Sequence, residues 1–128
     1  MNDQTAEILN RFNESWTSTE ILFDNLINNY PGFERLKPLR QFISLLKENH
    51  GNMNFRLGTS IHKLIISRSV DFELRSDQKY IMIDTININE YEVTLRDGKK
   101  LYRQYRLNNL EDNQLKKLLE TLKNTLVD

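Results

Sequence analysis

The chain has 128 residues, with 18 basic and 18 acidic side chains and no cysteine. This length supports one hydrophobic core, and the balanced charge argues against a histone-like role in coating polyanions. Without cysteine the fold can use neither disulfides nor thiolate metal sites, which fits a cytoplasmic location.

The order of sequence patterns predicts a single α+β domain over residues 1–128. A helical part is expected at 1–51, an antiparallel sheet at 52–107 and a closing amphipathic helix at 109–127. The first residues lack the basic start and apolar run of a signal peptide, and no stretch of 18 residues is apolar throughout. We therefore expect no membrane insertion.

The N-terminal part is expected to form about three helices. The first has its apolar stripe at the i, i+3, i+4, i+7 positions Thr5, Ile8, Leu9 and Phe12. Thr17 and Glu20 have the spacing of a capping box, so a second helix is predicted to begin near residue 18. Pro38 suits the first turn of the third helix, and Gly51 suits its C-terminal cap.

The second predicted helix carries more apolar surface than one buried face needs. Phe23 and Tyr30 belong to its main stripe, and Ile21 and Leu22 widen that stripe. A helix of this kind is buried on more than one side or lines a subunit interface. We therefore take these four residues as a candidate partner interface, used by a protein partner or in a homodimer.

After residue 51 the apolar period changes from 3.6 to 2, which indicates strands. About six are predicted, joined as an antiparallel meander by short turns, one of them at 58–60. They are expected at 53–57, 61–67, 70–75 and 80–85, and in a hairpin at 91–107. Two strands, 61–67 and 80–85, are apolar on both faces, so either helices cover both faces or the sheet curls towards a barrel.

The hairpin at 91–107 allows two registers. A two-residue Asp97-Gly98 turn would mix apolar and polar residues on each face. A three-residue loop at 96–98 with Gly98 at a bulge pairs odd positions with odd positions and separates the faces. Because a slip of one residue exchanges the faces, the second register is favoured.

The closing helix has a stripe of leucines at residues 115, 118, 119, 122 and 126. Asn109 is its expected N-cap. Burial of five leucines contributes about 8–15 kcal/mol before the loss of entropy is subtracted, so the helix must dock on the sheet or on a partner.

The meander followed by an amphipathic helix, at residues 53–126, resembles the pleckstrin-homology superfold. That fold has seven strands and lacks the three preceding helices. The resemblance concerns the fold alone and transfers no site residue.

Basic side chains gather in the second half of the hairpin. In the favoured register Arg96, Lys100, Tyr102 and Arg106 project from one face, and Arg103 lies among apolar neighbours on the other. Cations beside an aromatic ring can bind phosphates and stack on bases, whereas the alternative is that they are solvated charges protecting a sheet edge. Arg103 is expected to reach the sheet rim, to stack on a tyrosine or to hold an anion.

The remaining polar residues form no recognisable catalytic or metal-binding set. His50 is expected at the end of the third helix and His62 on a strand, and neither has a second histidine at a metal-ligand spacing. Neither a glycine-rich phosphate loop nor a nucleophile elbow is present. We expect no enzyme activity and no cofactor.

The sequence thus predicts a non-enzymatic protein-interaction module, such as an adaptor, an inhibitor or immunity-type protein, or an assembly subunit. The alternative is binding of nucleic acid or a phosphorylated ligand through Arg96, Lys100, Tyr102, Arg103 and Arg106 of the hairpin.

Overall fold

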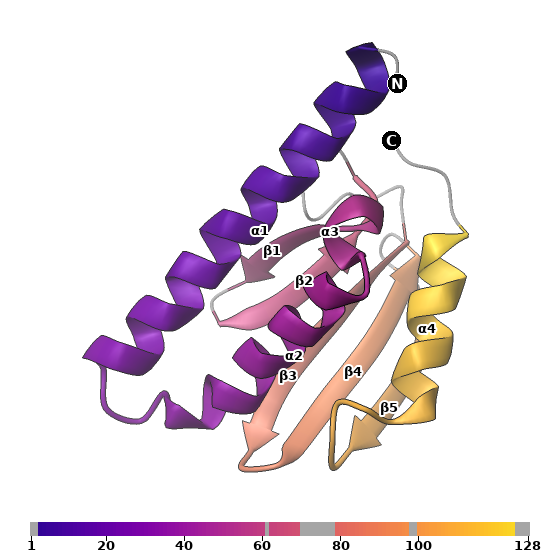
Figure 1. The fold of residues 1–128 in the computed structure, drawn as a ribbon. Helices are drawn as coiled ribbons and strands as arrows, with labels where there is room; N and C mark the ends of the chain where they lie inside the picture. Colours follow the sequence, from indigo (N-terminus) through magenta and orange to yellow (C-terminus); the bar gives the residue numbers. More distant parts are fainter. Residues whose placement is uncertain (1–2, 61, 70–78, 98–99, 125–128) are drawn as a thin grey trace.

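A computed structural model describes residues 3–60, 62–69, 79–97 and 100–124, and in them the chain is an α+β protein. The helices are α1 (Asp3–Asn29), the short 3-10 helix η1 (Glu34–Leu36), α2 (Lys37–Glu48), α3 (Gly51–Asn54) and α4 (Asn113–Lys123). The strands are β1 (Arg56–Ser60), β2 (Lys63–Ser67), β3 (Lys79–Asn87), β4 (Glu90–Asp97) and β5 (Lys100–Leu107). The longer helices α1, α2 and α4 lie over the same face of the sheet (Figure 1).

The first two predicted helices are one continuous helix, α1, so the prediction of a break near residue 18 is wrong. The Thr17 hydroxyl donates to the backbone carbonyl of Asn13, one turn back, instead of capping a new helix. Trp16 and Phe23 are fully buried on the same side of α1, and this burial outweighs the local capping signal. The helix ends before Pro31, as predicted.

The helix α2 is confirmed, with Pro38 in its first turn. Its predicted cap is wrong, because His50, with φ of 67°, adopts the left-handed conformation, and Gly51 begins α3. Gly51 is needed for space: a Cβ there would lie 2.6 Å from the carbonyl oxygen of Leu46. This glycine therefore marks close packing rather than a helix cap.

The first predicted strand is displaced. Met53 belongs to α3 and is half exposed, and β1 begins at Arg56. The turn predicted at 58–60 lies inside β1, where Gly58 is buried and pairs with Ile65.

The sheet is an antiparallel meander with strand order β1-β2-β3-β4-β5. Its described part therefore has five strands rather than about six, and the strand predicted at 70–75 falls outside the described residues. No pairing joins β1 to β5 within that part, so the sheet has two edges.

Both faces of the central strands carry buried side chains. Leu64 and Ile81 face the helices and join the main core with Trp16. Ile65 and Tyr80 alternate with them, point to the other face and are also buried. This agrees with the apolar character of both strands in the sequence.

The hairpin β4–β5 has the predicted odd-to-odd pairing over most of its length, with Tyr91 opposite Leu107 and Leu95 opposite Arg103. The predicted loop is wrong, because Arg96 and Asp97 continue β4 and pair with residues 101 and 100. The register shift leaves Tyr102 as the extra residue of a β-bulge, and the predicted bulge residue Gly98 lies outside the described residues.

The closing helix α4 begins four residues later than expected. Asp112 is its N-cap and accepts a hydrogen bond from the backbone N–H of Gln114 at 2.8 Å, while Asn109 accepts one from Glu111 in the preceding turn. Leu115, Leu118 and Leu122 are buried against the sheet, so α4 docks as predicted.

Candidate functional site

The candidate interface on α1 is divided between the core and the surface. Phe23 is fully buried in the core, and half-buried Leu22 lines a polar cleft between α1 and β1. Ile21 and Tyr30 are exposed, at 63% and 52%. The four candidate residues therefore do not form one exposed apolar surface.

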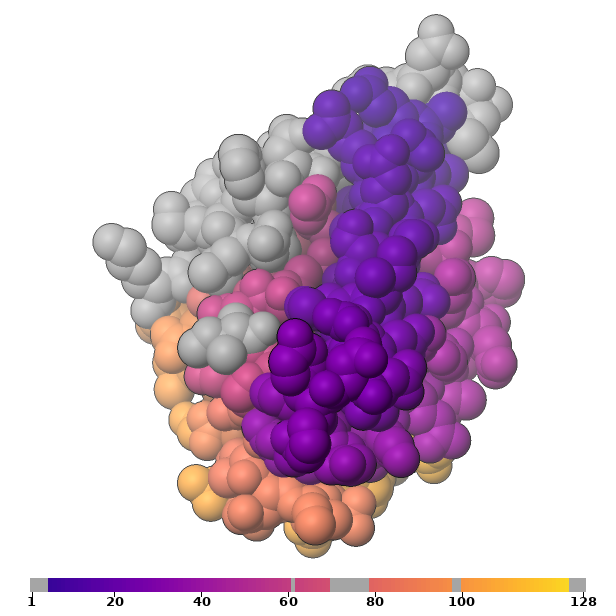
Figure 2. Space-filling model, turned by 90° about the vertical axis from the view of Figure 1, so that its left-hand side faces the viewer, coloured from indigo at the N-terminus to yellow at the C-terminus, as the bar shows by residue number. Residues whose placement is uncertain are grey.

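The outer face of α1 is polar around Ile21. Figure 2 views the molecule from the side of α1, whose outer surface runs uncovered along it. The exposed positions one turn either side of Ile21 are Thr17 and Asn25. A single isoleucine among polar residues is ordinary protein surface and does not make a docking patch.

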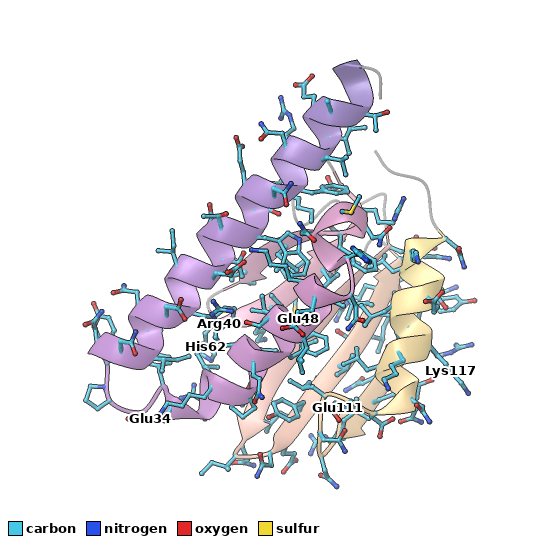
Figure 3. The ribbon with its side chains drawn as sticks, viewed as in Figure 1. Glu34, Arg40, Glu48, His62, Glu111 and Lys117 are labelled. Carbon is cyan, nitrogen blue, oxygen red and sulfur yellow. The ribbon has the colours of Figure 1, made fainter. Side chains whose placement is uncertain are left out.

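The α1 and α2 helices are joined by Arg40. Its guanidinium binds the carboxylates of Asp24, at 2.8 Å, and Glu20, at 3.3 Å. Figure 3 shows Arg40 between the two helices. This network fixes the position of α2 relative to α1.

The structure places His62 in the turn after β1, not on a strand. Its Nε2 lies 3.3 Å from a guanidinium nitrogen of Arg35, and its ring packs edge-on against Phe33. Because a guanidinium can only donate, Nε2 is the acceptor in this contact. These contacts hold the turn against η1.

The basic hairpin residues do not form one surface. Tyr102 is 47% exposed, with the Arg103 guanidinium carbon 4.7 Å and the Lys79 Nζ 5.7 Å from its ring centroid. Lys79 lies on the helix-facing side of β3, as Ile81 does. Because Tyr102 contacts Lys79, the bulge directs Tyr102 to this side. Tyr102 therefore does not share a face with Arg96 and Arg106, contrary to the prediction.

Arg106 lies at the other end of β5 and faces acidic residues. It contacts Glu90 at 3.4 Å and Glu92 at 3.9 Å. In the part of the chain that the structure describes, Arg96, Lys100 and Arg103 have no carboxylate within ion-pair distance. The predicted basic face is thus divided: Arg96, Lys100 and Arg103 lie towards the hairpin tip, and Arg106 lies at the other end of β5 beside two acidic residues.

A groove lies between α2 and α4. It consists of two adjoining cavities of about 530 and 210 Å³, which we call the α2–α4 groove. The two cavities adjoin each other, because four residues line both of them: Phe42, Leu45, Leu110 and Glu111. Glu111 lies beside the beginning of α4, whereas Lys117 points outward from that helix (Figure 3).

Apolar side chains line the inside of the α2–α4 groove. Phe42 and Leu46 come from α2, and half-buried Leu119 comes from α4. Phe55 closes one end of the floor, and Tyr91 lies at the other. Leu45 is 38% exposed at the rim, so its side chain is accessible to a ligand in the groove.

The rims of the groove differ in charge. On α4 the rim carries Lys116, Glu120 and Lys123 at i, i+4 and i+7. On α2 it carries Gln41, Leu45 and Asn49, at i, i+4 and i+8, without charge.

Two ionisable groups have perturbed pKa values. Burial raises the pKa of the Tyr91 phenol above its usual value of 10. Burial also lowers the pKa of the Arg68 guanidinium. This group donates to the carbonyl of Asn54 at 2.9 Å and so holds α3, which lines one end of the groove, against the end of β2. Neither group has a second titratable residue arranged with it for proton transfer among the described contacts.

No group of three or more histidine, aspartate or glutamate side chains gathers at one point within the described ranges. No helix in those ranges is both long enough and apolar enough to span a bilayer. Comparison with models of protein families, with curated proteins and with solved structures finds no match to this chain.

Sequence reasoning missed the groove because its two walls come from helices about 70 residues apart in the chain. The one available signal was Leu45, an extra apolar residue next to the buried stripe of α2.

Proposed function

We propose that this chain is a non-enzymatic protein-interaction module that binds an amphipathic helix of a partner protein in the α2–α4 groove. The supporting observation is a pair of adjoining, mainly apolar hollows between two helices that lie over one sheet face. A helix in such a groove is a recurring mode of recognition, with apolar anchors at i, i+3, i+4 and i+7. Exposed Leu45 would contact these anchors.

The rim charges define the partner further. One flank of the bound helix would carry an acid, a base and an acid, which would face Lys116, Glu120 and Lys123 in turn. The opposite flank would be uncharged, because the α2 rim carries no charge. Charge pairs at the flanks of packed helices select partners and orientation more than they add affinity. The partner helix is therefore apolar on one face and acidic at two positions seven residues apart.

Within this proposal the protein acts in the cytoplasm as an adaptor, an inhibitor or immunity-type protein, or an assembly subunit. A homodimer is the variant in which a second copy supplies the helix. The likeness to the pleckstrin-homology superfold adds nothing to the proposal, because helix binding depends on α2, which that fold does not have.

The test uses a fluorescent 18-residue peptide designed as a helix, with leucines on one face and Glu–Lys–Glu at spacings of four and three residues on the flank. Leu45→Arg places a charge in the groove and should weaken binding by at least about tenfold, since a desolvated charge costs several kcal/mol. The matched control is Ile21→Arg, which makes the same kind of change on the outer face of α1 and should leave affinity unchanged.

Fluorescence anisotropy titrations give both affinities. Equal effects of the two variants would contradict the proposal. Failure of the Glu–Lys–Glu peptide to bind better than the same helix with Lys–Glu–Lys would contradict the assigned charge pattern.

The alternative function, binding of nucleic acid or a phosphorylated ligand, is supported by the exposed Tyr102 with Lys79 and Arg103 against its ring. It predicts that a fluorescent single-stranded oligonucleotide binds with strong salt dependence and that Lys100→Glu weakens the binding. Unchanged affinity in Lys100→Glu would remove this alternative.

A further inference from the structure

The two edges of the sheet are treated differently. At the β1 edge, the backbone N–H of Leu57 donates to the Ser15 hydroxyl of α1 at 3.0 Å, so a helix covers this edge. At the other edge, β5 pairs only with β4 in the described residues, and its side chains from Lys100 to Gln104 are exposed. An uncovered edge strand presents unpaired N–H and C=O groups to which another strand can add.

The exposed edge carries one sign of charge. Lys100, Arg103 and Arg106 lie on β5, which has no acidic residue over its eight positions. Among these three, only Arg106 has described ion pairs, both across to β4 and both at 3.4 Å or more. An added strand with acidic side chains would face an excess of cations.

Charge also argues against a second copy as the occupant. An antiparallel pair of β5 strands related by a two-fold axis would bring these cations opposite one another or opposite neutral residues, never opposite acids. Like charges directly opposite on neighbouring strands are destabilising. The occupant that fits is an extended acidic segment of another protein.

We infer that the β5 edge binds an extended acidic segment of a partner protein by strand addition, at a site separate from the α2–α4 groove. Arg103 and Arg106 lie three residues apart and therefore point to opposite faces of the sheet. Two acidic residues three positions apart on the added strand would therefore each face one of these arginines. Between them, an apolar residue opposite Tyr105 covers its half-buried ring.

The test uses a ten-residue fluorescent peptide containing Glu-Val-Thr-Glu, with a Lys-Val-Thr-Lys peptide as the matched control. We expect only the glutamate peptide to bind, and its affinity to fall as salt is raised. Arg103→Glu should weaken the binding by about tenfold or more through lost attraction and added repulsion. Lys37→Glu, the same charge change at the start of α2, should leave it unchanged.

Strand addition has its own signature in hydrogen exchange. Binding of the glutamate peptide should slow exchange of amides in β5 and leave amides of α2 and α4 unaffected. Gln104→Glu, a milder change on the same exposed strand, should also weaken binding of the glutamate peptide. Circular dichroism checks that each variant is folded.

Three results would overturn the inference. They are equal binding of the two peptides, equal loss in Arg103→Glu and Lys37→Glu, and no protection of β5 amides in the complex. Binding of an oligonucleotide that depends on Arg103, without binding of the peptide, would assign the edge to nucleic acid instead. Leu45→Arg should not change the affinity for the acidic peptide. Failure of strand addition at β5 can therefore be distinguished from failure of helix binding in the groove.

Discussion

The indole Nε1 of Trp16 donates a hydrogen bond to the backbone carbonyl of Phe55 at 2.8 Å, although the two residues are 39 positions apart. Trp16 is fully buried in the middle of α1, and Phe55 lies between α3 and β1 at one end of the α2–α4 groove. This bond therefore ties the long first helix to the floor of the candidate site.

Replacing Trp16 by Phe should destabilise the protein by about 2–4 kcal/mol. The change removes the indole donor, so the carbonyl of Phe55 loses this hydrogen bond, and it creates a small cavity. Urea unfolding followed by circular dichroism measures the loss. Thr17→Ala, next to Trp16 on the exposed side, should stay within about 0.5 kcal/mol of the wild type, and a similar cost for both variants would refute the role assigned to Trp16.

Gly51→Ala should both destabilise the protein, by about 1–3 kcal/mol, and weaken helix binding in the groove. The new Cβ would lie 2.6 Å from the Leu46 carbonyl and 2.9 Å from the Trp16 ring, so α2 and α3 would have to move apart. Gly32→Ala is the control. A Cβ there meets nothing within 4 Å, and its φ of 94° makes alanine strained, so it should lower stability without changing the affinity for the helical peptide. An unchanged affinity in Gly51→Ala would show that the wall position does not matter.

Stability should decline in alkali partly through Tyr91. Burial raises the pKa of this phenol in the folded state above 10, so folding favours the neutral form. Its contribution is complete below the unfolded pKa of about 10 and is lost as the pH rises through the folded pKa. Unfolding free energies measured from pH 8 to 11 should fall less steeply in Tyr91→Phe than in the wild type. Identical slopes in Tyr91→Phe and the wild type would refute the assignment.

Arg40→Met should cost about 1–2 kcal/mol at low salt, because Asp24 and the mostly buried Glu20 would lose their shared partner. The cost should shrink in 1 M NaCl, where screening weakens the network. Arg11→Met, at an exposed pair with Glu7 one helical turn away, should change stability by less than about 0.5 kcal/mol. A salt-independent loss in Arg40→Met would point to packing of its methylene groups instead.

Patterns of burial could be predicted from the sequence. The stripe of Leu115, Leu118 and Leu122 located α4, and the separation of faces chose the odd-to-odd pairing of Val93 with Tyr105. Both predictions follow from the need to bury apolar side chains on one side of an element, which is a property of the element alone.

Local signals failed where tertiary contacts outweighed them. The spacing of Thr17 and Glu20 suggested a new helix, but Glu20 instead pairs with Arg40 and Lys47 of α2. The bulge at Tyr102 separates the basic residues of the hairpin, and no glycine at this position signals it in the sequence. The groove depends on the distance between α2 and α4, which the sequence pattern of either helix alone cannot predict.

The most direct test of helix binding is a ¹⁵N–¹H NMR titration of the full chain with the Glu–Lys–Glu helical peptide. If the peptide binds in the groove, amide shifts change in α2 around Leu45, in α4 from Lys116 to Lys123, and at Leu110 and Glu111, while those of β5 and the outer face of α1 stay unchanged. Shift changes confined to β5 or to α1, or no change at saturating peptide, would contradict helix binding in the groove.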